Sequence, residues 1–233
     1  NKNIDMTNND NFMEYFFDPE IKMMMRELPE GTLELDFSDP AVCRSTLETF
    51  AGAIDLDFSG VEVANEFLEP EPGGHKIPVR IYTPKHLKEK TGGLIHVHGG
   101  GFVIGSLDSE AATCISLCKE LEIVVISVGY RLAPEHPYPS GLNDCYAALS
   151  WASDLADSLL IDRERLGIYG LSAGGGICAA LALLSRDRNG PPICFQYLGI
   201  PEIDDRLTTP SMRKFSDTPI WNQELSKLSW KYY

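Results

Sequence analysis

The chain has 233 residues, of which 43% are hydrophobic and 23% charged, enough for one globular domain with a buried core. The formal net charge of −14 offers no attraction for a phosphate backbone, so we do not expect a nucleic-acid partner. No apolar run reaches the roughly 20 residues of a membrane span, and we expect no membrane anchor or signal peptide. Because the chain begins with Asn1 and not Met, we expect a processed or partial product.

The cysteines form no C-x-x-C pair and no Cys/His cluster with zinc spacing. This favours free thiols in a reducing compartment over disulfides, and we expect a cytoplasmic protein without a metal site. The cysteine positions are Cys43, Cys114, Cys118, Cys145, Cys178 and Cys194.

The first part of the chain carries two helix-start signals, each an Asp followed by Pro. Asp18 precedes residues 21–28 and Asp39 precedes residues 41–50, and Asp is a favoured N-cap before a proline in the first helical turn. Apolar side chains of the first helix repeat at helical spacing, so one face should lie against another part of the protein. Ordinary packing and a mobile lid over a pocket both fit this face.

From residue 61 onward the pattern becomes that of strands alternating with helices. Residues 61–68 and 77–82, separated by a Pro-Gly-Gly turn, predict an antiparallel hairpin. Alternation of later strands and helices predicts a parallel sheet covered on both faces. The expected strands cover residues 94–97, 123–128, 166–169 and 193–200, and the expected helices cover residues 107–120, 142–156 and 175–185.

The sequence Gly170-Leu171-Ser172-Ala173-Gly174 follows a predicted strand and precedes a predicted helix. In that context a G-x-S-x-G pattern indicates a sharp turn that lifts the serine hydroxyl out of the sheet, with the glycines leaving room for neighbouring backbone. The following helix points its free amides and dipole toward the serine. A glycine-rich turn with an incidental serine is the alternative.

A second motif, His98-Gly99-Gly100-Gly101-Phe102, follows the strand at residues 94–97. Consecutive glycines let bare amides approach a substrate oxygen. The amides of Gly100 and Gly101, with that of Ala173, would form an oxyanion hole of three donors. Alone, a glycine triplet is commonly just a flexible loop, but two motifs in this order reinforce each other.

These residues, together with the stretch Tyr130–Pro137, resemble the hormone-sensitive-lipase-like family of α/β-hydrolase esterases. The resemblance covers nearly all of the chain from about residue 61. It implies an N-terminal helical cap over residues 1–55 with a disordered start, and an α/β-hydrolase core over residues 56–233. It also implies that Ser172 is the nucleophile and that Gly100, Gly101 and Ala173 are the oxyanion donors, with no metal or organic cofactor. One departure is Leu171, where this family more often has Asp or Glu.

The serine needs a general base, and all five histidines precede Ser172. In the family, the acid and the base follow two further strands. The chain therefore resembles the N-terminal part of a longer hydrolase that lacks the last strands, and we expect the 233-residue chain alone to be inactive. We expect His98 to hold its loop and not to act as base. Asp204 and Asp205 could supply the acid or brace their loop.

The apolar stretch of residues 192–201 would be the last strand of the sheet. An exposed edge there would invite aggregation, so another strand or another chain, as in a homodimer, should cover it.

The leading functional hypothesis is a serine carboxylic-ester hydrolase acting on short-chain or small acyl esters through an acyl-enzyme. Within hydrolases, a peptidase or amidase is an alternative, because these residues do not distinguish esters from amides. The alternative from another class is a non-catalytic binding protein on the same scaffold, as in the plant gibberellin receptors.

Overall fold

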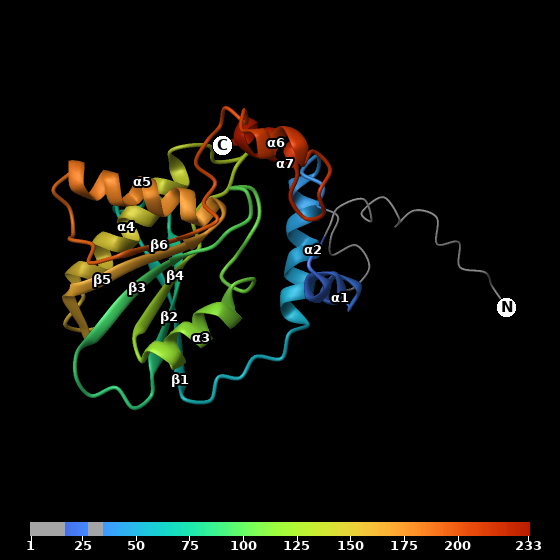
Figure 1. Cartoon of the computed structure of the whole chain (residues 1–233). Helices are drawn as coiled ribbons and strands as arrows, with labels where there is room; N and C mark the ends of the chain where they lie inside the picture. The colour runs from blue at the N-terminus through green and yellow to red at the C-terminus, as the bar shows by residue number, and fades with distance from the viewer. Residues whose placement is uncertain (1–16, 28–34) are drawn as a thin grey trace.

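A single six-stranded sheet forms the centre of the protein, whose computed structural model describes residues 17–27 and 35–233. In spatial order the strands are β1 (Val61–Leu68), β2 (Ile77–Pro84), β4 (Val124–Val128), β3 (Thr91–Val97), β5 (Ile161–Leu171) and β6 (Gln196–Gly199). β2 runs antiparallel to β1 and β4, and the other neighbours are parallel (Figure 1). The predicted hairpin and mostly parallel sheet are thus confirmed.

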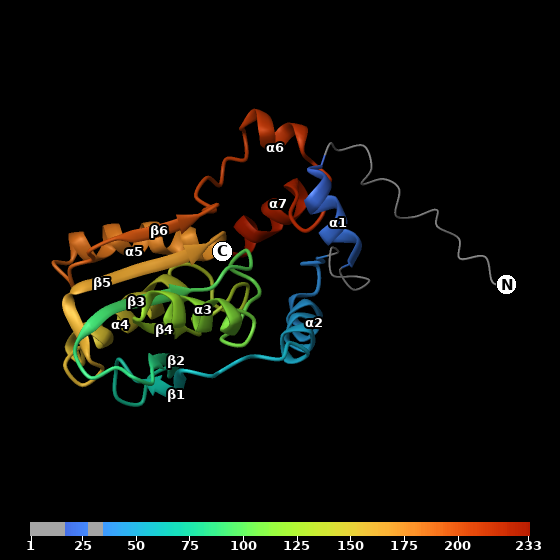
Figure 2. The same ribbon diagram turned by 60° about the horizontal axis from the view of Figure 1, so that its bottom comes forward.

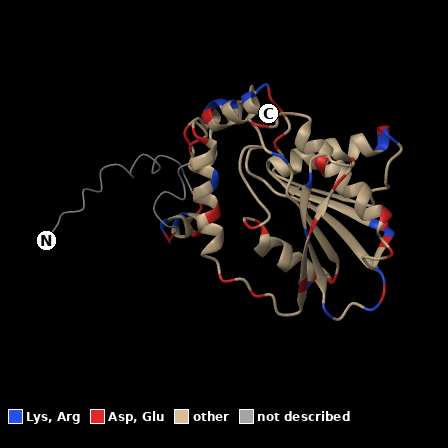
Figure 3. Cartoon of the chain, turned by 180° about the vertical axis from the view of Figure 1, so that it is seen from behind, with Lys and Arg blue, Asp and Glu red and all other residues tan. Residues whose placement is uncertain are grey.

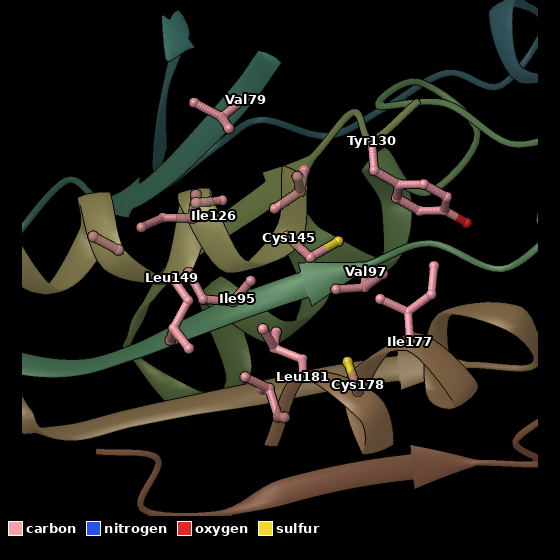
Figure 4. Close-up of a cluster of buried hydrophobic side chains, with 14 of the residues drawn as sticks. Val79, Ile95, Val97, Ile126, Tyr130, Cys145, Leu149, Ile177, Cys178 and Leu181 are labelled. Carbon is pink, nitrogen blue, oxygen red and sulfur yellow. The ribbon is translucent and has the colours of Figure 1, made fainter. Parts of the chain in front are cut away.

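Helices cover both faces of the sheet, which gives three layers. α4 (Ser140–Asp154) and α5 (Ala173–Asp187) lie on one face, and α3 (Ala111–Leu121) lies on the other. Side chains alternate between the faces along each strand, so Val124 and Ile126 join the layer of α4 and α5, whereas Val125 packs beside α3. Figure 4 shows Leu149 of α4 and Leu181 of α5 reaching the strands of this core.

Two helices precede the sheet, as the Asp-Pro pairs predicted. They are α1 (Pro19–Glu27) and α2 (Pro40–Gly52), and the Asp39 side chain caps α2 by accepting from two amides of its first turn. The prediction that the apolar face of α1 packs against another element is wrong for the described residues. No residue of α1 is buried, and Met24 is 66% exposed. Helical spacing of apolar residues indicates an amphipathic helix but does not show what the apolar face packs against. The expected disordered start, and Leu28, lie outside the described residues.

Two helices that the sequence analysis did not predict follow the sheet. α6 (Pro210–Lys214) and α7 (Gln223–Tyr232) lie with α1 and α2 at the end of the sheet where the parallel strands end (Figures 1 and 2). A separate apolar cluster at this end joins Phe37 and Cys43 to Ile104 and to Leu225 of α7.

The charged side chains are dispersed along the chain. Figure 3 shows Lys and Arg residues interspersed with Asp and Glu residues in loops and helices. Within residues 17–27 and 35–233, no helix combines the length and the apolar character needed to cross a bilayer. All six cysteines are free thiols, and all but Cys194 are buried.

One arginine of α2 ties this helix to the core. The Arg44 guanidinium donates to the carbonyl of Val103 at 2.7 Å and to that of Ala133 at 2.7 Å. It also forms a two-point pair with Glu135, with both distances 2.8 Å. The Ala133 amide in turn donates to the Phe102 carbonyl at 3.0 Å, so Arg44 binds two loops that already contact each other.

Arg44→Met is expected to lower the free energy of unfolding by about 2 kcal/mol, because two partly buried carbonyls lose a charged donor. Glu135→Gln is the matched control. It alters only the ion pair at a carboxylate whose side chain is 52% exposed, and a loss of about 0.5 kcal/mol is expected. Urea unfolding of both variants checks the difference, and equal losses would show that the bonds to the carbonyls contribute nothing.

Candidate active site

Ser172 lies at the turn between β5 and α5, as the motif predicted. Its backbone has φ 53° and ψ −121°, a left-handed conformation that costs energy for any residue with a Cβ. The Ser172 amide donates to the Gly199 carbonyl of β6 at 2.8 Å, which fixes the turn to the neighbouring strand. A Cβ at Gly174 would overlap the Val97 carbonyl, so only glycine lets the turn and β3 approach this closely.

The glycine-rich loop that follows β3 has an unusual backbone conformation. Gly100 has φ 113° and its carbonyl accepts from the amides of Val103 at 3.0 Å and Ile104 at 2.9 Å. The amides of Gly100, Gly101 and Ala173 have no hydrogen-bond acceptor among residues 17–27 and 35–233. Free amides at a tight turn can stabilise negative charge on a ligand oxygen.

A cavity of about 490 Å³ brings Ser172, Gly100 and Gly101 together at the carboxyl ends of the parallel strands. Ala173, the first residue of α5, is fully buried and is not among the residues that line the cavity. Apart from Glu202 and Asp204, the wall is mainly apolar. Its larger side chains are Leu35, Phe37, Ile104, Ile200, Ile203, Leu207, Met212, Ile220, Trp221 and Trp230.

None of the five histidines lines this cavity within the described part of the chain. His98 is buried beside it, where its Nδ1–H donates to the Gly99 carbonyl at 2.8 Å and its ring stacks on Tyr130. The Tyr130 hydroxyl donates to the His98 carbonyl at 3.0 Å. His98 therefore holds the start of the glycine-rich loop, as expected from the sequence. Burial lowers its pKa to about 4, so the ring is neutral at pH 7.

A second histidine, His96 of β3, is 1% exposed and stacks on Tyr169. Burial lowers the pKa of His96 to about 3, whereas an unfolded histidine titrates near 6.5. Between those values the unfolded chain binds a proton that the folded chain does not. This contribution to stability is complete above about pH 6.5 and is lost as the pH falls.

His96→Phe keeps an aromatic ring and removes the titrating group. We expect the loss of unfolding free energy between pH 7 and pH 5 to be smaller in this variant by about 2 kcal/mol. Ser127→Ala, which removes a buried hydroxyl beside His96 in the strand register, should change stability by the same amount at both pH values, because it removes no titrating group. Urea unfolding at the two pH values measures this, and parallel pH dependence in His96→Phe and the wild type would contradict it.

The two aspartates proposed from the sequence take different places. Asp204 lines the cavity, and its carboxylate accepts from the Arg206 guanidinium at 2.8 and 2.9 Å and from the Arg206 amide at 3.1 Å. These bonds lower the pKa of Asp204 and brace the turn. Asp205 is exposed and does not line the cavity.

Glu202, a carboxyl group that lines the same cavity as Ser172, was not predicted from the sequence. Its amide donates to the Ser172 carbonyl at 3.0 Å, and its side chain lines the cavity. Burial raises the pKa of Glu202 to about 7. The available signal was its position as the first acidic residue after the β6 strand, at the edge where Ser172 was expected.

The aromatic wall was also missed. Phe37 and Trp221 meet edge to face at 5.8 Å between ring centroids, and both would contact a Cβ placed at Gly101. Phe37 precedes the first strand in the sequence and Trp221 follows the last one, so no local sequence pattern links the two rings. No group of three or more His, Cys, Asp or Glu side chains within the described residues could hold a metal ion.

A serine at a strand-to-helix turn, facing a glycine-rich loop at the carboxyl edge of a mostly parallel sheet, defines the class of α/β hydrolases. A family model described as alpha/beta hydrolase fold matches residues 94–233, and the chain belongs to this family. The carboxylesterase NlhH of Mycobacterium tuberculosis is 40% identical over 149 residues, which are 64% of this chain and 47% of the relative. An arylesterase of Saccharolobus solfataricus is 39% identical over 142 residues, 60% of this chain and 45% of the relative.

Solved structures of esterases are similar to this chain as well. A bacterial heroin esterase superposes with a TM-score of 0.87 at 41% identity, over 93% of this chain and 68% of the other. The hyperthermophilic esterase of Pyrobaculum calidifontis gives a TM-score of 0.80 at 28% identity, over 94% of this chain and 71% of the other. The resemblance to hormone-sensitive-lipase-like esterases is thereby confirmed. The chain spans about half the length of the curated relatives it matches.

Proposed function

We propose that the protein is a serine carboxylic-ester hydrolase that acts on small acyl esters through an acyl-enzyme. The observation that carries the proposal is the shared cavity. Ser172, held in a strained turn, lines it together with Gly100 and Gly101, whose amides lack acceptors in the described chain. Such a site offers a nucleophile and a place for developing negative charge within one small volume.

In the proposed reaction, Ser172 Oγ attacks the ester carbonyl carbon while a general base takes the hydroxyl proton. The amides of Gly100, Gly101 and Ala173 donate to the oxyanion. The carbon–alkoxy bond breaks, the base returns the proton to the leaving alcohol, and the acyl group stays on Oγ. Water, deprotonated by the same base, then attacks the acyl carbon, releasing the carboxylic acid and restoring the serine hydroxyl.

The proposed general base is a histidine outside residues 1–233. This is supported by the cavity wall, which contains none of the five histidines of the described chain. Asp204 braces its own turn with Arg206, and we place the acid of the triad in the same region outside residues 1–233. By itself the 233-residue chain should therefore hydrolyse esters only slowly.

The proposed substrates are esters of modest size. Relatives and similar structures are named carboxylesterase, arylesterase and heroin esterase, and the cavity of about 490 Å³ has a mainly apolar wall. Apolar walls favour uncharged acyl and alcohol groups. The proposal includes residues 1–55 as a cap over a core of residues 56–233, supported by Leu35 and Phe37, which line the cavity from the N-terminal side.

Two finer proposals concern the surroundings of the protein. Six free cysteines support a reducing, cytoplasmic location. The strand β6 lies at the edge of the sheet, and its Tyr197 is 48% exposed, which supports pairing with another strand or with a second copy.

The test is hydrolysis of p-nitrophenyl acetate by the full-length gene product and by its Ser172→Ala variant. Turnover that depends on Ser172 supports the proposal. The ligand-binding alternative instead predicts equal, background rates in the two proteins together with saturable binding of an ester that is not consumed.

A further inference from the structure

The Glu202 side chain contacts α7. Its Oε1 lies 3.0 Å from the hydroxyl of Ser229, and its Oε2 is buried without a hydrogen-bond partner in the described chain. Ser229 is completely buried, and its Oγ lies 2.8 Å from the Gly101 carbonyl. One hydroxyl thus joins Glu202 to the glycine-rich loop.

The count of protons at this hydroxyl decides which bonds can exist together. Ser229 has one proton to donate, and both the Gly101 carbonyl and an ionised Glu202 would need it. An ionised carboxylate is the stronger acceptor and would leave the buried carbonyl without a donor. When Glu202 is protonated it donates to Ser229 Oγ, and Ser229 donates to the Gly101 carbonyl. Only this second arrangement gives Glu202 Oε1, Ser229 Oγ and the Gly101 carbonyl a hydrogen-bond partner each.

Glu202 is also fixed to the nucleophile turn. Its amide donates to the Ser172 carbonyl at 3.0 Å, and a Cβ at Gly176 of α5 would overlap the Glu202 carbonyl. The residue therefore has little freedom to move when its side chain changes partner. Through Ser229 it spans from the turn that carries Ser172 to the loop that carries Gly101.

We propose that protonated Glu202 and Ser229 form a relay that positions the amide of Gly101 in the oxyanion hole, and that loss of the Glu202 proton releases this loop. Both are positioning residues, because they act through Gly101. The inference rests on the proposed ester hydrolysis. It predicts that activity falls as the pH rises through the titration of Glu202, in addition to any dependence on the general base.

In the part of the chain that the structure describes, the surroundings of Glu202 supply no competing charge. Burial is the main cause of its raised pKa, near 7, and the bond that Ser229 donates to the ionised form opposes it. Among the described residues, the only other titratable side chain in the cavity wall is Asp204, which is paired with Arg206. On α5, Gly176 lies against the Glu202 carbonyl and carries no side chain. The charged residues of α7 are Glu224, Lys227 and Lys231, of which the first two pair with each other at its surface.

The experiment is the pH profile of kcat and KM for p-nitrophenyl acetate, measured on the full-length gene product at the isosbestic wavelength of the p-nitrophenol pair. For the wild type, kcat should fall about ten-fold above pH 7, less than the 10²–10³-fold cost of removing an oxyanion donor. In Glu202→Gln the amide donates to Ser229 at every pH, so the descending limb should vanish and activity at low pH should be kept. Ser229→Ala should lower kcat about ten-fold at low pH with little change in KM.

Ser185→Ala is the matched control. This buried serine also donates to a backbone carbonyl, that of Pro191 at 2.8 Å, but at the opposite end of α5. It should keep the wild-type profile. A wild-type profile that does not fall above pH 7, a fall that persists in Glu202→Gln, or an unchanged Ser229→Ala would overturn the relay while Ser172-dependent turnover remained. Rates independent of Ser172 would overturn the hydrolase proposal and the relay with it.

Discussion

Ser172→Ala is expected to lower kcat/KM of the full-length gene product by a factor of about 10⁵, because the acyl-enzyme path is lost and the remaining donors can only bind and polarise the ester. The backbone should change little. Alanine carries the same Cβ strain at φ 53°, and the bonds at this turn use the amide and carbonyl of residue 172, not its hydroxyl.

Initial rates on p-nitrophenyl acetate, corrected for spontaneous hydrolysis, measure this effect. Near-ultraviolet circular dichroism of the variant should match that of the wild type and so exclude misfolding as the cause. The 233-residue chain belongs in the same assay and should resemble the variant. Wild-type rates in Ser172→Ala would remove the serine from the mechanism, and fast turnover by the 233-residue chain would show that a residue within it acts as base.

Gly100→Ala should have the second-largest effect, a loss of about 10²–10³-fold in kcat, because it displaces a donor of the oxyanion hole. The backbone at Gly100 has φ 113°, which residues with a Cβ rarely adopt, and the new Cβ would overlap the carbonyl of Ile104. The loop must shift to accept alanine, and its amides shift with it.

Gly73→Ala is the control for backbone strain alone. Gly73 has φ 73° in the hairpin turn, and nothing lies within 4 Å of an added Cβ. It should lose about 1 kcal/mol of stability and keep kcat. Steady-state kinetics with thermal unfolding of both variants separates the two effects. A folded Gly100→Ala that keeps kcat within two-fold of the wild type would place the oxyanion donors elsewhere.

The parts of the fold that could be predicted from the sequence are those that depend on residues close together in the chain. The unbroken apolar run at Val124, Val125 and Ile126 indicates a strand buried on both faces, and Gly170 and Gly174 around Ser172 indicate the sharp turn. A serine or a glycine placed by its own neighbours can be located without knowing the rest of the molecule.

Contacts between distant segments could not be predicted in this way. Ser229 donates to the Gly101 carbonyl although the two residues are 128 positions apart, and no sequence pattern near either residue indicates this contact. The apolar face of α1 is a false prediction of the same kind. Its helical spacing predicted packing, but Met24 is largely exposed. Glu202 was overlooked because a lone glutamate acquires a raised pKa only from the burial that tertiary structure imposes.

The most direct test of the central claim is to trap the nucleophile. The full-length gene product is incubated with a fluorophosphonate ester, which mimics the tetrahedral intermediate, and its intact mass and proteolytic peptides are then measured. We predict one adduct per chain, on the peptide that contains Ser172, and none in Ser172→Ala. An unlabelled wild type, or an adduct that forms equally in the variant, would contradict the assignment of this serine as the nucleophile.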